Sequence, residues 1–431
     1  MIIRFIYTLA LTLIAPLLIW ELYRSKGGKP RVGARWKEHW GVISSPAFKS
    51  RPIWIHAVSV GEMLAAIPLI ERISSEYPDC DILITTTTTT GAEQAKKLSG
   101  LATHLYMPFD FPFAVKRFIN TINPSQLLIM ETELWPNTLH IAKQKQIPVT
   151  IVNARLSDKS LHGYRRVWPI VNQISKCIHK VLCQHQSDVK NFELLGFSQE
   201  KLATTGSIKF DIQISTSVQI KGTSLRATIG KSRPVWIAAS THAGEDDIIL
   251  SAHKKLQEEL PTALLILVPR HPERFKQVEL LAKKDFHTIA RSSRSMIEPT
   301  TQVYLGDSMG EMLELISASD ICFMGGSLVG RKAGGHNLLE PAALAKPILT
   351  GPSYYNFKEV TNTLIANGGC EIIHSDTELA AKLYSLFIDH QHREELGQSV
   401  LHVVQENSGA VDKTMLQLTK IFAENSSYLR S

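Results

Sequence analysis

The sequence predicts an α/β protein built from two doubly wound domains, each with a parallel sheet. Its 431 residues exceed the length over which a single hydrophobic core keeps growing, roughly 250 to 300 residues, so two domains are expected. Short apolar runs alternate with helical patterns along most of the chain, as in strand–helix–strand units. Hydrophobic residues make up 44% and charged residues 20%, which excludes a disordered or collagen-like chain.

The apolar runs give six strand candidates in each half of the chain. Helical patterns such as Met63–Ser75 and Asn137–Gln144 lie between them, and this alternation predicts parallel sheets. Two such halves are expected to bind ligands in a cleft at the carboxyl ends of their strands. The candidate strands are 53–58, 81–86, 104–107, 127–130, 148–153 and 180–184, then 235–240, 263–269, 286–290, 302–305, 320–325 and 347–351.

These patterns divide the chain into four segments. We expect an apolar segment at 1–23, a first domain at 24–211, a polar linker at 212–233 with at most one helix, and a second domain at 234–431. The last helical pattern, 410–424, either docks outside the second sheet or packs back on the first domain. Five cysteines without a CxxC pair predict neither a disulfide framework nor a zinc site.

The N-terminal segment predicts a retained membrane anchor. Its first twenty residues carry one charge, Arg4, and an apolar run from Phe5 to Trp20, just below the roughly 17 residues of the shortest spanning helices. The alternative is a buried N-terminal helix of a soluble protein. A basic collar follows, and by the positive-inside rule it places the later domains in the cytoplasm. The collar holds Arg24, Lys26, Lys29, Arg31, Arg35 and Lys37 against Glu38, a net +5 of the chain's +7.

The first domain carries acids where its strands end. Glu62 opens the helix after 53–58, and Glu131 and Glu133 follow 127–130 directly. An early Glu also complements a helix dipole, and paired acids also occur in ordinary turns, so structural roles remain open. Because the dipole lowers a carboxyl pKa, a base at Glu62 would need burial to oppose it. The cations Arg155 and Lys209, with Asp211, are expected at the same rim.

The second domain carries cations and glycines. Arg270 and His271 follow a strand that ends at Pro269, where exposed amides and a guanidinium suit a phosphate. Asp307 or Ser308 is expected to cap a helix with Glu311 in a capping box. Glycines 325, 326, 334 and 335 precede Asn337 and Glu340, a pattern suited to ribose hydroxyls, with phosphate on neighbouring amides. No GxGxxG, Walker or DxD motif is present, which excludes the enzymes that depend on them.

Nine ordered motifs together resemble the bacterial 3-deoxy-D-manno-octulosonic acid (Kdo) transferase family. They are GARWKEHWG, HAVSVGE, METELWPN, NARLS, GSIKFD, STHAGE, VPRHPERF, GDSMGEM and GGHNLLEP. The resemblance implies a GT-B glycosyltransferase with two Rossmann-like domains and an N-terminal membrane anchor. It implies an inverting, metal-independent and cofactor-free transfer of Kdo from CMP-Kdo to the lipid A precursor, tetraacyldisaccharide bisphosphate, in lipopolysaccharide synthesis at the cytoplasmic face of the inner membrane.

The same resemblance assigns roles to residues. It implies that Glu62 is the general base and that Glu131 and Lys209 stabilise the transition state. The positions that match the family's CMP-binding residues are Pro269, Arg270, Met309, Gly310, Glu311, Asn337, Leu338, Leu339 and Glu340.

The sequence departs from the family's pattern at one loop, and two other functions remain as alternatives. The loop VGRKA, residues 329–333, is about two residues longer than the family's usual loop, which affects how it fits around the sugar nucleotide. A sugar-nucleotide epimerase would use the same fold without a membrane. A non-catalytic membrane adaptor that binds nucleotide would make Glu62 and Glu131 dispensable. The basic collar beside an apolar segment favours a membrane surface over nucleic acid as partner.

Overall fold

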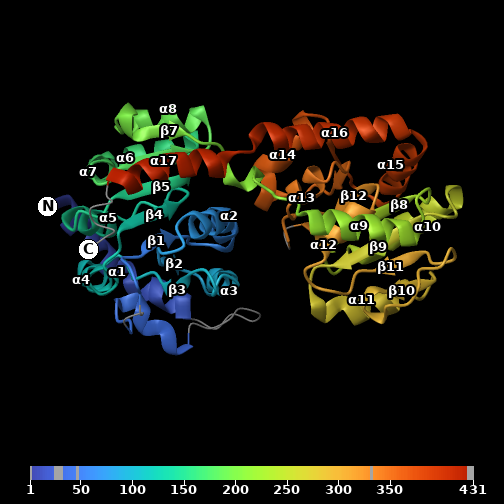
Figure 1. Cartoon of the computed structure of the whole chain (residues 1–431), viewed down its shortest axis with the longest axis horizontal. Helices are drawn as coiled ribbons and strands as arrows, with labels where there is room; N and C mark the ends of the chain where they lie inside the picture. Colours follow the sequence, from blue (N-terminus) through green and yellow to red (C-terminus); the bar gives the residue numbers. More distant parts are fainter. Residues whose placement is uncertain (1, 24–32, 45–47, 331–332, 425–431) are drawn as a thin grey trace. The chain divides into compact units, whose positions relative to one another are not determined.

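The computed structural model describes residues 2–23, 33–44, 48–330 and 333–424. The chain forms two compact units, the first made of residues 1–211 and 408–431 and the second of residues 212–407. Each unit contains one seven-stranded sheet (Figure 1), and every described strand pair runs parallel. The predicted pair of parallel-sheet α/β domains is therefore confirmed.

The sheet of the first unit has the order β3-β2-β1-β4-β5-β6-β7. The chain builds outward from β1 in one direction, then returns to add β4 on the other side of β1, so the order reverses between these two strands. Such a reversal is where α/β sheets bind ligands. The strands are β1 (Ile53–His56), β2 (Ile82–Thr86), β3 (Thr103–Tyr106), β4 (Gln126–Met130), β5 (Val149–Ala154), β6 (Lys180–Cys183) and β7 (Leu202–Thr204).

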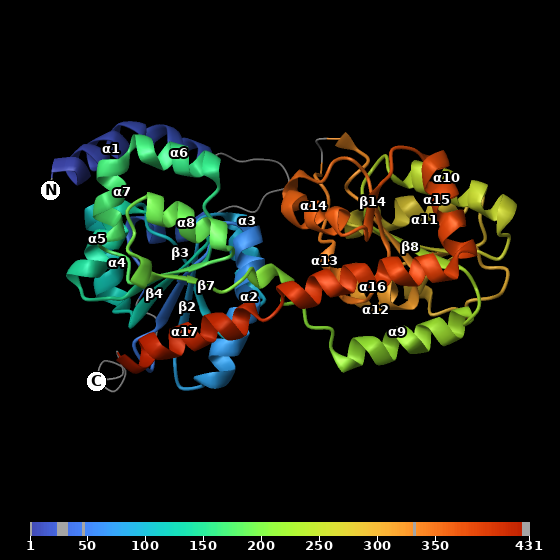
Figure 2. The ribbon, with the colours of Figure 1, turned by 90° about the horizontal axis from the view of Figure 1, so that it is seen from above.

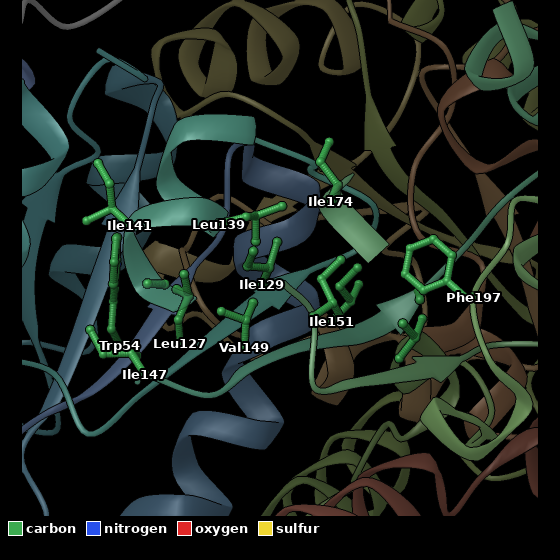
Figure 3. Close-up of a cluster of buried hydrophobic side chains, with 14 of the residues drawn as sticks. Trp54, Leu127, Ile129, Leu139, Ile141, Ile147, Val149, Ile151, Ile174 and Phe197 are labelled. Carbon is green, nitrogen blue, oxygen red and sulfur yellow. The ribbon is translucent and has the colours of Figure 1, made fainter. Parts of the chain in front are cut away.

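Helices cover both faces of this sheet. The helices are α1 (Ile2–Tyr23), α2 (Val60–Glu76), α3 (Thr89–Lys96), α4 (Pro112–Ile122), α5 (Pro136–Gln144), α6 (Asp158–Arg166), α7 (Trp168–Ser175), α8 (Gln186–Leu194) and α17 (Ala410–Glu424), with 3₁₀ helices at Gly33–Trp40, Gln199–Lys201 and Ile208–Phe210. Side chains on one sheet face pack against α2 and α17. The opposite face packs against α4, α5, α7 and α8, and Figure 3 shows part of this core, with Leu127, Ile129, Val149 and Ile151 side by side on β4 and β5.

The segment expected as a membrane anchor is the helix α1. It packs on α5 and α7, and Asn137 Nδ2 on α5 donates a hydrogen bond to Thr8 Oγ1 at 3.0 Å. Within the described ranges, the chain has no helix with the length and apolar character needed to cross a membrane. Residues 24–32, which hold most of the basic collar, lie outside the described residues.

The sheet of the second unit has the order β10-β11-β9-β8-β12-β13-β14. The chain again builds outward in one direction and then adds β12 on the other side of β8, so the reversal falls between β8 and β12. The strands are β8 (Val235–Thr241), β9 (Leu264–Pro269), β10 (Thr288–Ala290), β11 (Val303–Leu305), β12 (Ile321–Met324), β13 (Ile348–Thr350) and β14 (Cys370–Ile372).

The expected linker at 212–233 contains the helix α9 (Thr216–Ile229), which belongs to the second unit. It packs on α12 (Met312–Ala318), where Gly222 leaves no room for a side chain beside Ser317. The other helices of this unit are α10 (Asp246–Glu259), α11 (Phe275–Ala282), α13 (Leu339–Ala343), α14 (Lys358–Ala366), α15 (Asp376–Ile388) and α16 (His390–Asn407), with 3₁₀ helices at Pro272–Arg274, Arg291–Ser293 and Tyr355–Phe357.

The final helix, α17, packs on the first unit rather than outside the second sheet. It lies along α2, as the view in Figure 2 shows. The carboxylate of Asp211 accepts hydrogen bonds from the backbone N–H groups of Gly409 (2.6 Å) and Val411 (2.5 Å). A carboxylate at these otherwise unpaired amides fixes the start of the helix. Asp211 is therefore occupied by this structural role and does not provide a free charge at the rim.

Candidate active site

The first unit places Glu62 at the start of α2, directly after β1. Ser59 is the N-cap of this helix, and its hydroxyl accepts a hydrogen bond from the Glu62 backbone. The Glu62 side chain folds back over the turn. Its Oε2 accepts from the Val58 N–H at 2.8 Å, and its Oε1 accepts from the Ser59 hydroxyl at 2.9 Å. These two bonds hold the carboxyl group at the carboxyl end of β1.

Burial dominates the acidity of Glu62. Only 8% of the residue is exposed, and this burial raises its pKa to about 7, while the hydrogen bonds from Val58 and Ser59 oppose the rise. The negative charges of Glu131 and Glu133 raise the pKa further. Burial of Glu62 thus supplies the rise in pKa that a base at this position needs. A carboxyl group with such a pKa accepts a proton near neutral pH.

Glu131 follows β4, the strand beside β1. Its backbone has a φ of +58°, in the left-handed region that is costly for a side-chain-bearing residue and that clusters at functional sites. Lys209 Nζ donates to Glu131 Oε1 at 2.9 Å, and both side chains are partly exposed. Burial also raises the pKa of Glu133, whose Oε2 accepts from Trp135 Nε1 at 3.2 Å. The structure thus brings Glu62, Glu131 and Lys209 to two neighbouring strand ends.

His56 is a polar residue of this region that the sequence reasoning passed over. It is the last residue of β1 and is 1% exposed. Its Nδ1 lies 3.2 Å from the Thr85 carbonyl oxygen, which can only accept, so Nδ1 carries the proton. Burial lowers the pKa of His56 to about 4, which leaves the ring neutral, and its Nε2 has no hydrogen-bond partner among the described residues. The only sequence signal was its place at the head of HAVSVGE.

In the second unit, the predicted donor-site residues come after three strands, β11, β9 and β12. In the sheet, β11 and β9 are neighbours, and β8 lies between β9 and β12. Pro269 is the last residue of β9, and the Arg270 backbone N–H donates to the Thr241 carbonyl at 3.0 Å. The Arg270 side chain is exposed. The neighbouring Arg274 instead pairs with the buried Asp246 on α10. Arg270 is therefore the available guanidinium at this strand end.

The structure at Met309–Glu311 differs from the helix start that the sequence predicted there. The expected capping box is wrong, because α12 starts at Met312 with Glu311 as its N-cap, and Asp307 instead accepts from the Ser292 N–H. Glu311 accepts two hydrogen bonds from the Arg291 guanidinium, at 2.6 and 2.7 Å. These bonds lower its pKa to about 2, so it is ionised. Glu311 and Arg291 line a cavity of about 580 Å³ within this unit.

The glycine-rich loop leads into the short helix α13. Asn337 Oδ1 accepts from the Leu339 N–H at 3.1 Å, and Asn337 Nδ2 lies 3.4 Å from Glu340 Oε1. Burial raises the pKa of Glu340, and the charge of Arg270 opposes the rise. Leu338 and Leu339 are each 1% exposed, so these two residues present almost no surface to a ligand. Within the longer 329–333 loop, residues 331–332 lie outside the described residues.

Two histidines missed by the sequence reasoning meet beside this loop. His242 follows β8 and His336 precedes α13, and their Nε2 atoms lie 2.9 Å apart with the rings stacked. The His271 ring stands edge-on to His242 at 5.3 Å between centroids. Burial lowers the pKa of both His242 and His336, so one neutral ring donates to the other. No group of three or more potential metal-ligating side chains occurs among the described residues.

Comparisons with known proteins agree with these features. A family model described as 3-deoxy-D-manno-octulosonic-acid transferase (kdotransferase) matches residues 34–212. The 3-deoxy-D-manno-octulosonic acid transferase of Haemophilus influenzae is 40% identical over 425 residues, which cover 98% of this chain and 99% of that relative. The crystallised C-terminal CMP-Kdo binding domain of WaaA from Acinetobacter baumannii is 32% identical and covers 44% of this chain and 99% of its own, with a TM-score of 0.42.

A more distant likeness concerns the fold alone. UDP-GlcNAc 2-epimerase from Neisseria meningitidis, solved with UDP-GlcNAc, covers 86% of this chain and 100% of its own at 14% identity, with a TM-score of 0.54. Two parallel-sheet α/β units that resemble GT-B enzymes, together with the family matches, define a glycosyltransferase. The chain belongs to the 3-deoxy-D-manno-octulosonic acid (Kdo) transferase family.

Proposed function

We propose that the protein transfers Kdo from CMP-Kdo to the lipid A precursor, with inversion at the anomeric carbon and without a metal ion. An acceptor hydroxyl oxygen forms the new bond to the anomeric carbon. The bond from that carbon to the CMP phosphate oxygen breaks, and CMP leaves with the electron pair. The acceptor's proton passes to the enzyme. Such a reaction needs a base at the hydroxyl and positive charge at the leaving phosphate.

Glu62 is proposed as the general base, and its environment is the main observation that supports the proposal. Its burial, its pKa of about 7 and its fixed place at the strand-order reversal support this role. A base with a pKa near the working pH is deprotonated in a large part of the molecules and still accepts a proton readily. Glu131 and Lys209, joined at 2.9 Å, are proposed to stabilise charge that develops in the transition state.

The second unit is proposed to hold CMP-Kdo. Arg270 is proposed to supply the positive charge for the leaving phosphate, and Asn337 and Glu340 are proposed to bind the hydroxyls of the nucleotide. Ser308, Glu311 and Arg291 line a cavity that is proposed to hold the rest of the nucleotide. These roles rest on the positions of the residues after three strands of one sheet, β11, β9 and β12.

Mass spectrometry of the lipid A precursor after incubation with enzyme and CMP-Kdo tests the reaction. We expect Kdo-containing lipid with the wild type, a loss of at least a hundredfold in rate with Glu62→Gln, and wild-type rates with Glu71→Gln, an exposed position on the same helix. Full activity of Glu62→Gln would remove the residue from the mechanism. Lipid without added sugar would refute the transfer, and an epimerised sugar nucleotide would indicate the alternative activity.

We also propose that α1 holds the protein at the cytoplasmic face of the inner membrane, where the acceptor resides. One side of the helix packs on α5 and α7, and the large apolar residues on the other side are half or more exposed. An apolar stripe on a helix favours insertion at the interface between headgroups and acyl chains. The basic collar adds attraction to anionic lipids. The exposed residues are Phe5, Ile6, Leu9, Leu13, Ile14, Leu17 and Trp20.

Co-sedimentation with vesicles of phosphatidylethanolamine and phosphatidylglycerol tests this contact. The double variant Leu13→Asp and Leu17→Asp changes side chains that are 74% and 70% exposed, so the fold should persist while vesicle binding falls at least tenfold. Leu280→Asp, at an exposed leucine of α11 in the second unit, is the matched control. Unchanged binding of the double variant would refute the role of α1.

A further inference from the structure

The buried carboxylate of Glu245 binds four backbone N–H groups. It is 0% exposed and lies at the turn between β8 and α10. Its Oε2 accepts from His242 (2.8 Å) and Gly326 (2.6 Å), and its Oε1 accepts from Ser327 and Leu328 (both 2.8 Å). A carboxylate has about four lone-pair positions, so these bonds saturate it. Three of the four amides come from the glycine-rich loop.

This contact decides what the loop can bind. Successive backbone amides in such a turn form a concave site that attracts an anion. Here that anion is the protein's own side chain. The amides of 326–328 are therefore occupied and are not open to the leaving phosphate of a donor. Side-chain cations such as Arg270 remain as candidates to bind it.

The contact of Glu245 with the start of the loop also constrains the residues at the end of the loop. The Gly335 N–H donates to the Gly326 carbonyl at 2.8 Å, so the end of the loop is tied to its start. His336 follows directly and shares its 2.9 Å contact with His242, the residue whose backbone also binds Glu245. A Cβ on Gly326 would lie 2.8 Å from the His336 ring, which shows how closely the parts fit.

We propose that Glu245 is a positioning residue of the donor site. It clamps the glycine-rich loop to the β8–α10 turn, and it thereby sets the positions of His336, Asn337 and Glu340 toward the nucleotide. The inference rests on the proposed binding of CMP-Kdo by this unit. It goes beyond that proposal by naming a residue that touches no substrate and is required for the shape of the site.

Glu245→Gln tests the inference in the full-length protein. The amide nitrogen of Gln cannot accept, so two of the four N–H groups lose their partner. We expect calorimetry to show CMP binding at least tenfold weaker, and kinetics to show a KM for CMP-Kdo raised more than kcat is lowered. Hydrogen exchange measured by mass spectrometry should become faster at 326–328. Glu245→Asp keeps the negative charge on a side chain that is one methylene shorter. We expect its CMP affinity to lie between that of the wild type and that of Glu245→Gln.

Asp320→Asn provides the matched control. The Asp320 carboxylate accepts from the Val235 N–H at 2.9 Å and pairs with Arg226, at the other end of the same sheet. This variant should lower the thermal midpoint and leave CMP affinity unchanged. If Glu245→Gln binds CMP as tightly as the wild type does, the inference is wrong. If the Gln variant does not fold, CMP binding by Glu245→Asp is the test, and wild-type affinity of that variant refutes the inference. A wild type that binds neither CMP nor CMP-Kdo would instead overturn the proposed function.

Discussion

Replacing Glu62 with Gln is a direct test of the base because it removes the charge and nearly preserves the shape. The Gln oxygen still accepts from Val58, and the Gln amide donates to the Ser59 hydroxyl, so both local bonds are retained. Burial raises the pKa of Glu62 from 4.5 to about 7. Such a shift corresponds to roughly 3 kcal/mol, at about 1.4 kcal/mol per pKa unit.

The sign of the pH dependence follows from this raised pKa. Between pH 4.5 and about 7, the folded protein keeps the Glu62 proton that the unfolded chain releases. The stabilisation is therefore complete below pH 4.5 and is lost as the pH rises through about 7. Glu62→Gln has no such proton to lose. It should match the wild type at acidic pH and exceed its stability by up to roughly 3 kcal/mol at pH 8.

Thermal unfolding at pH 5, 6.5 and 8 measures this difference in stability. The rate of Kdo transfer across the same pH range reports the ionisation of the proposed base. We expect the midpoint of Glu62→Gln to rise relative to the wild type by several degrees at pH 8, while Glu71→Gln shows no such trend. The wild-type rate should rise with pH through about 7. A stability difference that stays constant with pH, or a rate without this rise, would refute the reasoning.

Four further substitutions have expected outcomes. Arg270→Ala should weaken CMP binding at least tenfold by calorimetry with little change in stability, because its side chain is exposed. Lys209→Met should lower kcat while the thermal midpoint stays within about a degree, because an exposed ion pair contributes only about 0–1 kcal/mol. Gly334→Ala should weaken CMP binding in the same assay, because φ is +80° there. Asp211→Asn should release α17, detected as faster proteolysis at 408–424.

Much of the fold could be predicted from the alternation of apolar and helical patterns. Each predicted strand corresponds to a strand of the structure. The edge strands β7 and β14 were missed because they are short and only partly buried, so neither shows a continuous apolar run. The helix α9 was taken for part of a linker because its sequence is mostly polar, and its main contact depends on the absence of a side chain at Gly222. The location of α17 depends on the long-range bonds of Asp211.

Sequence reasoning could name candidate site residues where a residue type at a strand end suggests its own chemistry, as at Glu62 and Arg270. It could not name residues whose environment comes from a contact between distant segments. Glu245 and Gly326 are 81 positions apart, and His242 and His336 are 94 apart, so no local pattern links them. The capping box at 308–311 failed for a related reason, because Arg291 binds Glu311 from another segment.

The acids of the second unit explain why a cation remains available there. Three acids near the carboxyl ends of its strands have partners within the protein: Glu311 pairs with Arg291, Asp246 pairs with Arg274, and Glu245 accepts from four amides. Burial raises the pKa of a fourth, Glu340, and so favours its neutral form. Arg270 is left without a side-chain partner in the described part of the chain. Its exposed guanidinium suits a leaving phosphate, whereas Glu62 and Glu131 make the corresponding edge of the first unit suited to accept a proton.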